Sequence, residues 1–150
     1  MRTYEPVAVA RQFLFVREVP SNRGLRVEAI QKWGGGAAGD SWCCYFATMV
    51  LDICYQGACP LPRTGSCDEV LRLARTKGWV VTEPQPNDVY LRVKDGNDAH
   101  HIGFVCEVQG ETFTQLSGNT SADGLSSNGD GVYERVIKRS ADIVFVKLPE

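Results

Sequence analysis

Residues 40–55 read DSWCCYFATMVLDICY and predict the helix around which the rest of the chain is organised. Asp40 is a favourable helix N-cap, and the mostly apolar residues 42–55 that follow predict a buried helix. With Asp40 as the N-cap, Cys43 is the third helical residue. Its sulfur would then lie near unpaired backbone N–H groups at the positive end of the helix dipole, which stabilise a thiolate and lower the thiol pKa. The alternative is a plain core helix in which Cys43 is one more buried cysteine.

The first half of the chain predicts helices and the second half predicts strands. Apolar spacing and helix-terminal residues place helices at residues 6–14, 25–33, 42–55 and 66–77, the last beginning with the capping box Ser66-Cys-Asp-Glu69. Alternating apolar residues between turn residues predict strands at 79–82, 88–93, 102–108, 112–116, 132–137 and 143–146. Residues 117–131 are rich in Ser, Gly, Asn and Asp and are expected to form a surface loop. Helices followed by an antiparallel sheet indicate an α+β fold in a single domain, residues 1–150.

Composition excludes several classes of function. Of the 150 residues, 43% are hydrophobic and 23% are charged, which is typical of a soluble globular domain. The formal net charge is -2 and the basic residues are scattered, so we expect no nucleic-acid partner. No apolar stretch is long enough to span a bilayer, so we expect no membrane association. The first residues, Met1-Arg-Thr-Tyr-Glu-Pro6, lack the pattern of a secretory signal, which predicts synthesis in the cytoplasm.

Six cysteines could suggest a disulfide framework, but the context argues against one. A domain of this size can build its own core, and no signal peptide directs it to an oxidising compartment. Cys54, Cys59 and Cys67 are irregularly spaced and form no paired Cys-x-x-Cys clusters, so a structural zinc site is not expected. A bridge between Cys59 and Cys67 remains open.

Three residues together suggest a catalytic site. His101 stands at the start of the apolar segment Ile102-Gly-Phe-Val105, and Asn119 follows later in Gly118-Asn119-Thr120. The order Cys43, His101, Asn119 supplies the nucleophile, the base and the orienting group that thiol-dependent acyl transfer requires. Each residue also has an ordinary structural interpretation: a buried cysteine, a strand-end histidine and a turn asparagine.

The choice of histidine depends on how two strands pair. His100 and His101 are neighbours, so their side chains point to opposite faces of a strand and only one can face a given site. A strict two-residue hairpin at Gln109-Gly110 pairs Asn119 with His100 and Gly118 with His101. Either a bulge shifts this register by one residue, or His100 is the base.

Five short motifs follow one another along the chain. They are Glu18-x-Pro20-x-Asn22-x-Gly24, Asp40-x-Trp42-Cys43-x-x-Phe46, Pro86-Asn87-Asp88-Val89, His101-Ile-Gly-Phe-Val105 and Gly118-Asn119-Thr120-Ser121. Their type and order resemble those of the CHAP (cysteine, histidine-dependent amidohydrolase/peptidase) and NlpC-like cell-wall hydrolases, over nearly the whole chain from about Val7 to Leu148. Two departures are Asn87, where the family usually has Gly, and Cys44, where many members have a small residue.

The resemblance implies a papain-like fold, with N-terminal helices packed on an antiparallel sheet and the nucleophile at a helix N-terminus. It implies Cys43 as nucleophile, His101 rather than His100 as base, and Asn119 as the orienting residue. Ser41 and Trp42, with the backbone N–H of Cys43, are candidates for the oxyanion hole and substrate groove. No metal and no organic cofactor is expected.

The function implied is a cysteine amidase or endopeptidase that cleaves amide bonds in the stem peptides of bacterial peptidoglycan. Such an enzyme would be a monomer of the phage-lysin or secreted-effector type, with a possible immunity or delivery protein as partner. It would act on the cell wall or in the periplasm after release or delivery. Two alternatives stay open: a transamidase or glutamine-deamidating toxin with the same triad, and a non-catalytic phage structural module of the same fold.

Overall fold

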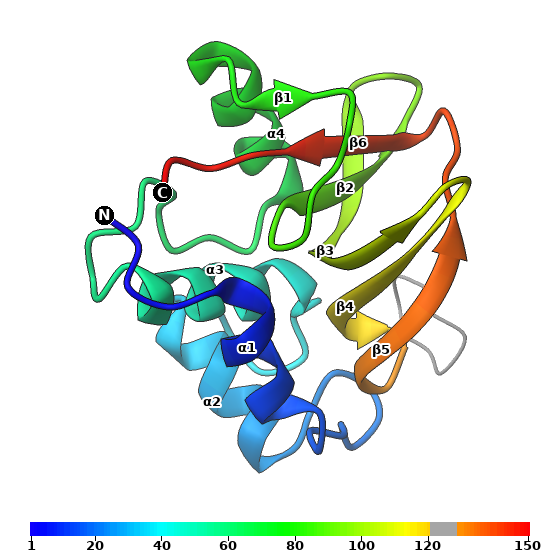
Figure 1. Cartoon of the computed structure of the whole chain (residues 1–150). Coiled ribbons are helices and arrows are strands. Elements are labelled where there is room, and N and C mark those ends of the chain that lie inside the picture. Colours follow the sequence, from blue (N-terminus) through cyan, green and yellow to red (C-terminus); the bar gives the residue numbers. More distant parts are fainter. Residues whose placement is uncertain (121–128) are drawn as a thin grey trace.

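The computed structural model of the chain describes residues 1–120 and 129–150. Helices precede strands, which confirms the α+β layout (Figure 1). The helices are α1 (Pro6–Ala10), the 3-10 helix η1 (Arg11–Phe13), α2 (Leu25–Trp33), α3 (Cys43–Cys54) and α4 (Cys67–Lys77). The strands are β1 (Val80–Val81), β2 (Val89–Lys94), β3 (Asp98–Gln109), β4 (Thr112–Thr120), β5 (Gly131–Lys138) and β6 (Ile143–Val146).

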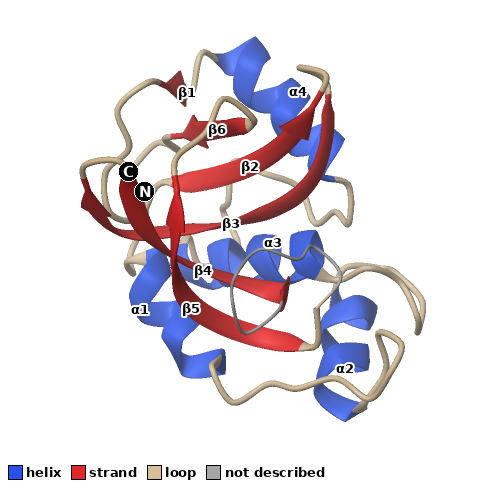
Figure 2. Cartoon of the chain, turned by 90° about the vertical axis from the view of Figure 1, so that its right-hand side faces the viewer, coloured by secondary structure: helices blue, strands red, loops and turns tan. Residues whose placement is uncertain are grey.

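The strands form one antiparallel sheet in the order β1-β6-β2-β3-β4-β5. Figure 2 shows how strongly this sheet twists, so that β2 and β5 cross the view in different directions. α1, α3 and α4 pack against β3, while α1 and α3 also contact β4. The long strand β3 therefore carries much of the contact between the helices and the sheet.

Alternating side chains give the sheet two apolar faces. Val89, Leu91 and Phe104 belong to the main core, which they share with the helices. Their neighbours Tyr90 and Val105 belong to a smaller cluster with Phe113, Ile137, Ile143 and Phe145. This follows from the period of two in a strand, which sends successive residues to opposite faces. Polar groups on the second face are therefore enclosed as well.

One strand is longer than the sequence predicts. Residues 117–120 were expected in a loop, but they extend β4 and are buried. Their composition favours turns, yet tertiary contacts hold them: a Cβ on Gly118 would lie 2.8 Å from Trp42 Cζ3 and 2.9 Å from Phe46 Cγ. The glycine thus lets β4 approach α3 closely. Residues 121–128 of the expected loop lie outside the described residues.

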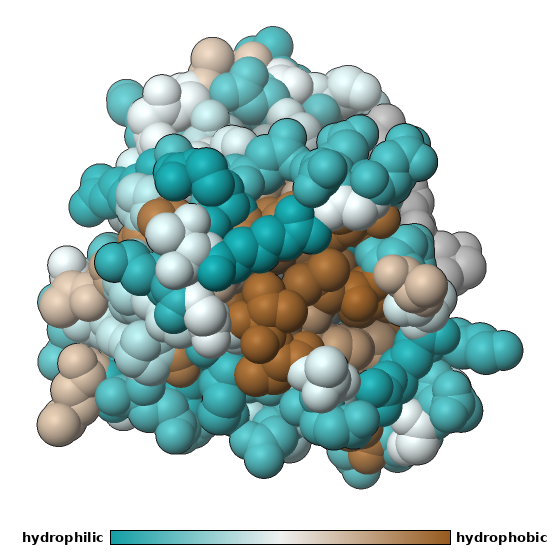
Figure 3. Space-filling model, turned by 90° about the horizontal axis from the view of Figure 1, so that it is seen from above, coloured by the Kyte–Doolittle hydropathy of each residue, from teal (hydrophilic) through white to brown (hydrophobic). Residues whose placement is uncertain are grey.

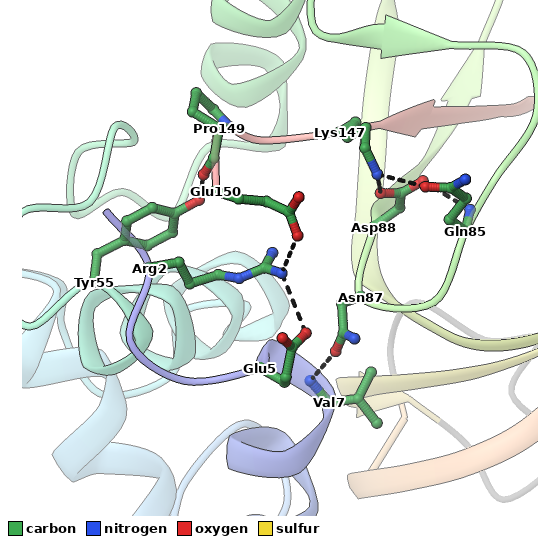
Figure 4. A network of polar contacts seen from close by, with 10 residues as sticks. All are labelled: Arg2, Glu5, Val7, Tyr55, Gln85, Asn87, Asp88, Lys147, Pro149 and Glu150. Atoms are coloured by element: carbon green, nitrogen blue, oxygen red, sulfur yellow. Dashed lines mark hydrogen bonds and ion pairs between the residues drawn. The ribbon is translucent and has the colours of Figure 1, made fainter.

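A polar network joins the two ends of the chain to the region before β2 (Figure 4). Arg2 pairs with Glu5 and Glu150 at 3.1 and 2.9 Å, and the Tyr55 hydroxyl donates to the Pro149 carbonyl. Asn87 has a φ of 77°, and its Oδ1 accepts a hydrogen bond of 2.9 Å from the Val7 N–H at the start of α1. Asn87 therefore tolerates a left-handed backbone and also caps a helix.

The surface is largely hydrophilic. Figure 3 shows one face on which a hydrophobic area is framed by hydrophilic residues. Apolar atoms always make up a large share of a protein surface, so this area alone indicates no function. In the described part of the chain, no helix is long and apolar enough to cross a membrane.

Candidate active site

The start of α3 differs from the prediction in one respect. Asp40 was expected to be the N-cap, but Trp42 occupies that position and makes no side-chain capping bond. Asp40 instead accepts a hydrogen bond of 2.9 Å from the Ala37 N–H and one of 3.4 Å from the Tyr45 hydroxyl. The carboxylate is thus used to close the preceding glycine-rich turn. Cys43 is consequently the first helical residue, and its N–H belongs to the helix-terminal amides that have no intrahelical acceptor.

The loop before α3 is held by the motif at residues 18–24. Glu18 Oε1 accepts from Trp42 Nε1 at 3.2 Å, and its Oε2 accepts from the Asn22 N–H at 2.9 Å. Gln31 Nε2 donates to the carbonyls of Asn22 and Asp40. The Trp42 side chain is fully buried and packs edge-to-face on Phe46. The expectation that Trp42 lines a substrate groove is therefore wrong, because its ring anchors α3 in the core.

The turn between β3 and β4 is Gly110-Glu111 rather than the expected Gln109-Gly110, because Gln109 pairs with Thr112, and a bulge further along β3 shifts the register by one residue. The pair Val105–Gln115 is followed by Glu107–Thr114, so Cys106 is the extra residue. His101 itself is only 1% exposed. Its Nε2 lies 3.1 Å from Ser117 Oγ, whereas its Nδ1 has no hydrogen-bond partner among the described residues.

Behind Ser117 the polar contacts continue into the second core. The Ser117 hydroxyl donates to Gln115 Oε1 at 2.8 Å, and the Tyr90 hydroxyl donates to the same oxygen at 2.5 Å. These groups come from the neighbouring strands β2, β3 and β4, and the Tyr90 and His101 rings are 6.2 Å apart. We call His101, Ser117, Gln115 and Tyr90 the polar chain. It lies among apolar side chains, where each of its hydrogen bonds is shielded from water.

Asn119 is near the site but does not orient His101. A regular continuation from the Phe104–Leu116 pair would set Asn119 opposite His101. β4 is irregular here, however: its pairing with β5 shifts register between Ser117 and Thr120, and the φ of Asn119 is 52°. Its side chain turns to the loop before α3, where Nδ2 donates to Ser41 Oγ at 3.0 Å. Ser117, two residues earlier on the strand, makes the contact with the imidazole that was expected of Asn119.

The Cys43 thiol is 3% exposed and has a second cysteine beside it. Its Sγ lies 4.0 Å from Cys67 Sγ at the start of α4, and this contact together with burial raises the pKa of Cys43 well above the usual value. His101 acts in the opposite direction and lowers this pKa. The lowered thiol pKa expected for Cys43 is therefore wrong, since the Cys67 contact and desolvation outweigh the imidazole.

All six cysteines are free. The open possibility of a Cys59–Cys67 disulfide is thus wrong, because Cys67 faces Cys43 while Cys59 Sγ accepts a hydrogen bond from the Leu61 N–H. Among the residues that the structure describes, no group of three His, Cys, Asp or Glu side chains is arranged to hold a metal ion.

A polar pocket of about 400 Å³ opens beside this arrangement. It is lined by Asp40, Ser41, Tyr45, Thr64, Gly65 and Ser66. These residues belong to the loops that lead into α3 and α4 and to the first turn of α3, and neither Cys43 nor Cys67 is among them. A larger pocket beside α1 is apolar and contains none of the candidate catalytic residues.

Sequence reasoning missed Cys67 and Tyr90 as partners of the site, and it considered Gln115 and Ser117 only as substitutes for Asn119. Both substitutes had a usable signal, since they precede Asn119 by an even number of residues and therefore lie on the same face of a regular strand. Comparison of the chain with protein-family models, curated proteins and solved structures finds no match.

Proposed function

We propose that the chain is a cysteine-dependent amidase or endopeptidase of the CHAP/NlpC-like type, with a papain-like arrangement of nucleophile and base. The observation that carries this proposal is the position of Cys43 at the first residue of α3, next to an imidazole whose Nε2 is held by Ser117 and whose Nδ1 is free. A thiol, a base within its reach and a group that holds the base are the parts that acyl transfer requires.

The raised pKa of Cys43 determines how the thiol would react. A thiol that is mostly protonated near neutral pH must lose its proton as it attacks the carbonyl, so His101 acts as a general base. Nδ1 takes the proton, the sulfur bonds to the carbonyl carbon, and the imidazolium then protonates the leaving amine. Water hydrolyses the resulting thioester with the imidazole again acting as base.

Ser41 and the helix terminus supply donors for the developing oxyanion. Because Asn119 Nδ2 donates to Ser41 Oγ, the Ser41 hydroxyl hydrogen is free to point into the polar pocket. The Cys43 backbone N–H is a second donor at the same helix end. In this proposal, Asn119 positions an oxyanion donor and Ser117 positions the base.

The proposed substrate is the peptide part of peptidoglycan. The pocket at the starts of α3 and α4 is lined by hydroxyl groups and one carboxylate, which suits a polar peptide better than an apolar ligand. The choice of peptidoglycan rests on the motif resemblance. The enzyme would reach the cell wall or periplasm by release or delivery, with a delivery or immunity protein as a possible partner.

The decisive experiment is digestion of purified peptidoglycan followed by mass spectrometry of the products. New amines and carboxylates at a single type of amide bond are expected with the wild-type protein. Cys43→Ala should abolish their formation, whereas Cys44→Ala, the matched control at the adjacent buried thiol, should keep most of it. Activity that survives in Cys43→Ala and is lost in Cys44→Ala would contradict the assignment of the nucleophile.

The same digestion distinguishes the alternative functions. A transamidase would join an added amine to the acyl group, and a glutamine deamidase would leave peptidoglycan intact while converting a protein glutamine to glutamate. A non-catalytic module would give no product at all and no acyl-enzyme on Cys43.

A further inference from the structure

Gln115 is a fully buried amide at the middle of the polar chain. It does not touch His101, and its Oε1 is bonded by two hydroxyl hydrogens, those of Tyr90 and Ser117. Its Nε2 has no partner among the described residues. An amide that accepts two hydrogens at one oxygen fixes the direction of both hydrogen bonds.

The direction of these bonds determines where the proton sits on His101. A serine hydroxyl has one hydrogen to donate, and in Ser117 that hydrogen goes to Gln115 Oε1. Ser117 Oγ can then only accept from the imidazole, 3.1 Å away, so His101 Nε2 must carry the proton. A neutral imidazole has one protonated nitrogen, which leaves the lone pair on Nδ1.

We infer that Gln115, which accepts a hydrogen bond from Tyr90, is a positioning residue. It sets the His101 tautomer through Ser117 and so keeps Nδ1 as the base for Cys43. This rests on the proposed function. It adds that the residue determining the base lies two hydrogen bonds away from the imidazole.

Two features keep the polar chain in this pattern of hydrogen bonds. Burial raises the pKa of the Tyr90 hydroxyl, so that it remains protonated and continues to donate to Gln115. Gly103 leaves room for the contacts, since a Cβ there would lie 2.6 Å from Tyr90 Cε1 and 2.7 Å from Ser117 Cβ. The amide in the reverse orientation would present N–H groups to both hydroxyls. The Ser117 hydrogen would then point to His101 Nε2 and force the proton onto Nδ1, which disables the base.

The test reads the tautomer directly by long-range ¹H–¹⁵N NMR of the ¹⁵N-histidine-labelled full chain, at a pH where the imidazole is neutral. His100→Gln assigns the two ring systems. The wild type is expected to carry the His101 proton on Nε2. Gln115→Met removes the acceptor and should give a mixture of both tautomers, with kcat lower by about ten- to a hundredfold, less than the ~10⁴ lost with a wrong tautomer in a serine triad. Gln115→Glu restores an acceptor-only group and should restore the Nε2–H form.

The same Gln→Met change at the exposed residue Gln109 is the matched control and should alter neither the spectrum nor kcat. If Gln115→Met does not fold, as judged by circular dichroism, Ser117→Ala breaks the same link and should also mix the tautomers. A proton on Nδ1 in the wild type would overturn the inference, and so would an unchanged tautomer in Gln115→Met or, where that variant does not fold, in Ser117→Ala. If the tautomer responds as expected but peptidoglycan is not cleaved, the proposed substrate fails while the role of Gln115 stands.

Discussion

At the scale of single residues, neighbouring side chains shift the pKa of Cys43 in opposite directions. Cys67 and burial raise the Cys43 pKa, while His101 lowers it. The thiol is consequently held in its neutral form until a substrate carbonyl accepts the electron pair. Such a site resembles a serine–histidine pair in its proton transfers more than a preformed thiolate–imidazolium pair.

The first prediction concerns the pH dependence of thiol alkylation. Because the Cys43 pKa is raised, its thiolate fraction near neutral pH is small, and its iodoacetamide rate should rise about tenfold per pH unit into the alkaline range. Cys67→Ala removes the largest cause of the raised pKa and should move the rate curve to lower pH. Peptide mass spectrometry after timed labelling measures the rate at Cys43.

Cys59→Ala, at a thiol that does not contact Cys43, is the control and should leave the curve in place. Easier access of iodoacetamide to Cys43 would raise the plateau rate of the curve without moving its midpoint, whereas a lower Cys43 pKa would move the midpoint. The curve therefore separates these two effects of Cys67→Ala. An unmoved midpoint would show that Cys67 does not control the pKa of Cys43.

The second prediction concerns the contact between Asn119 and Ser41. Removing an oxyanion donor costs on the order of a hundredfold or more in kcat, so Ser41→Ala should fall in that range. Asn119→Ala should lose a similar or smaller factor, because it frees the Ser41 hydroxyl to rotate. The double variant should be no worse than Ser41→Ala alone, since the two residues act as one unit.

Asn97→Ala, at an exposed asparagine bonded to Arg75, is the matched control and should keep wild-type turnover. Multiplicative losses in the double variant would mean that Asn119 and Ser41 act independently.

At the scale of secondary-structure elements, the helix ends are stabilised by groups from distant parts of the chain. α3 has no side-chain cap of its own, and α1 receives its cap from Asn87, eighty residues later. Among the helices that the structure describes, only α4 has a side-chain cap within its own segment, where Ser66 Oγ accepts from the Glu69 N–H at 3.2 Å. The start of α4 can therefore be predicted from a local sequence motif. The start of α3 cannot, and the prediction of Asp40 as its N-cap was wrong.

The third prediction concerns the cap on α1. Asn87→Gly suits the positive φ but removes the acceptor for the Val7 N–H, so we expect a loss of about 1 kcal/mol in the free energy of unfolding. For a chain of this size, that corresponds to about 2–4 °C in Tm, measurable by calorimetry. Asn87→Asp keeps the acceptor and should lose less.

Asp95→Gly is the matched control, because Asp95 also has a positive φ, of 52°, and no side-chain hydrogen bond is found for it among the described residues. Its unfolding free energy should change by less than about 0.5 kcal/mol. Equal effects of the two glycine substitutions would remove the capping role from Asn87.

At the scale of the whole molecule, catalysis in the proposed enzyme requires that α3 and the sheet dock in one arrangement, because Cys43 and His101 come from different layers. Gly118 is at the closest approach of these layers, between Trp42 and Phe46 of the helix region and the end of β4. The packing of this contact therefore couples stability to the relative position of nucleophile and base.

The fourth prediction is that Gly118→Ala separates the two layers. Its Cβ would lie 2.8 to 3.0 Å from ring and Cβ atoms of Trp42 and Phe46, so the free energy of unfolding should fall by about 1–3 kcal/mol and kcat should fall with it. Trp42→Phe removes the ring atom nearest to the new methyl group. A double-mutant cycle should accordingly show that the two changes together destabilise less than their sum. Additive losses, or a Gly118→Ala variant as stable as the wild type, would contradict this account.

The sequence by itself determined the element order, the positions of most helices and strands, and the candidate Cys43 and His101. Hydrophobic periodicity, capping residues and turn residues act over a few positions, and these local effects are readable from the chain. A bulge was one of two expected outcomes for the β3–β4 register, but neither its position at Cys106 nor the turn at Gly110-Glu111 was predicted.

Only the tertiary structure decided which polar groups meet. It placed Ser117 rather than Asn119 on His101, brought Cys67 to Cys43, and buried Trp42 instead of exposing it. These contacts depend on the twist of the sheet, a one-residue register shift and the docking of α3, all of which join residues far apart in sequence. The raised pKa of Cys43 follows from such contacts too, since the neighbouring Cys67 thiol and burial outweigh the imidazole of His101.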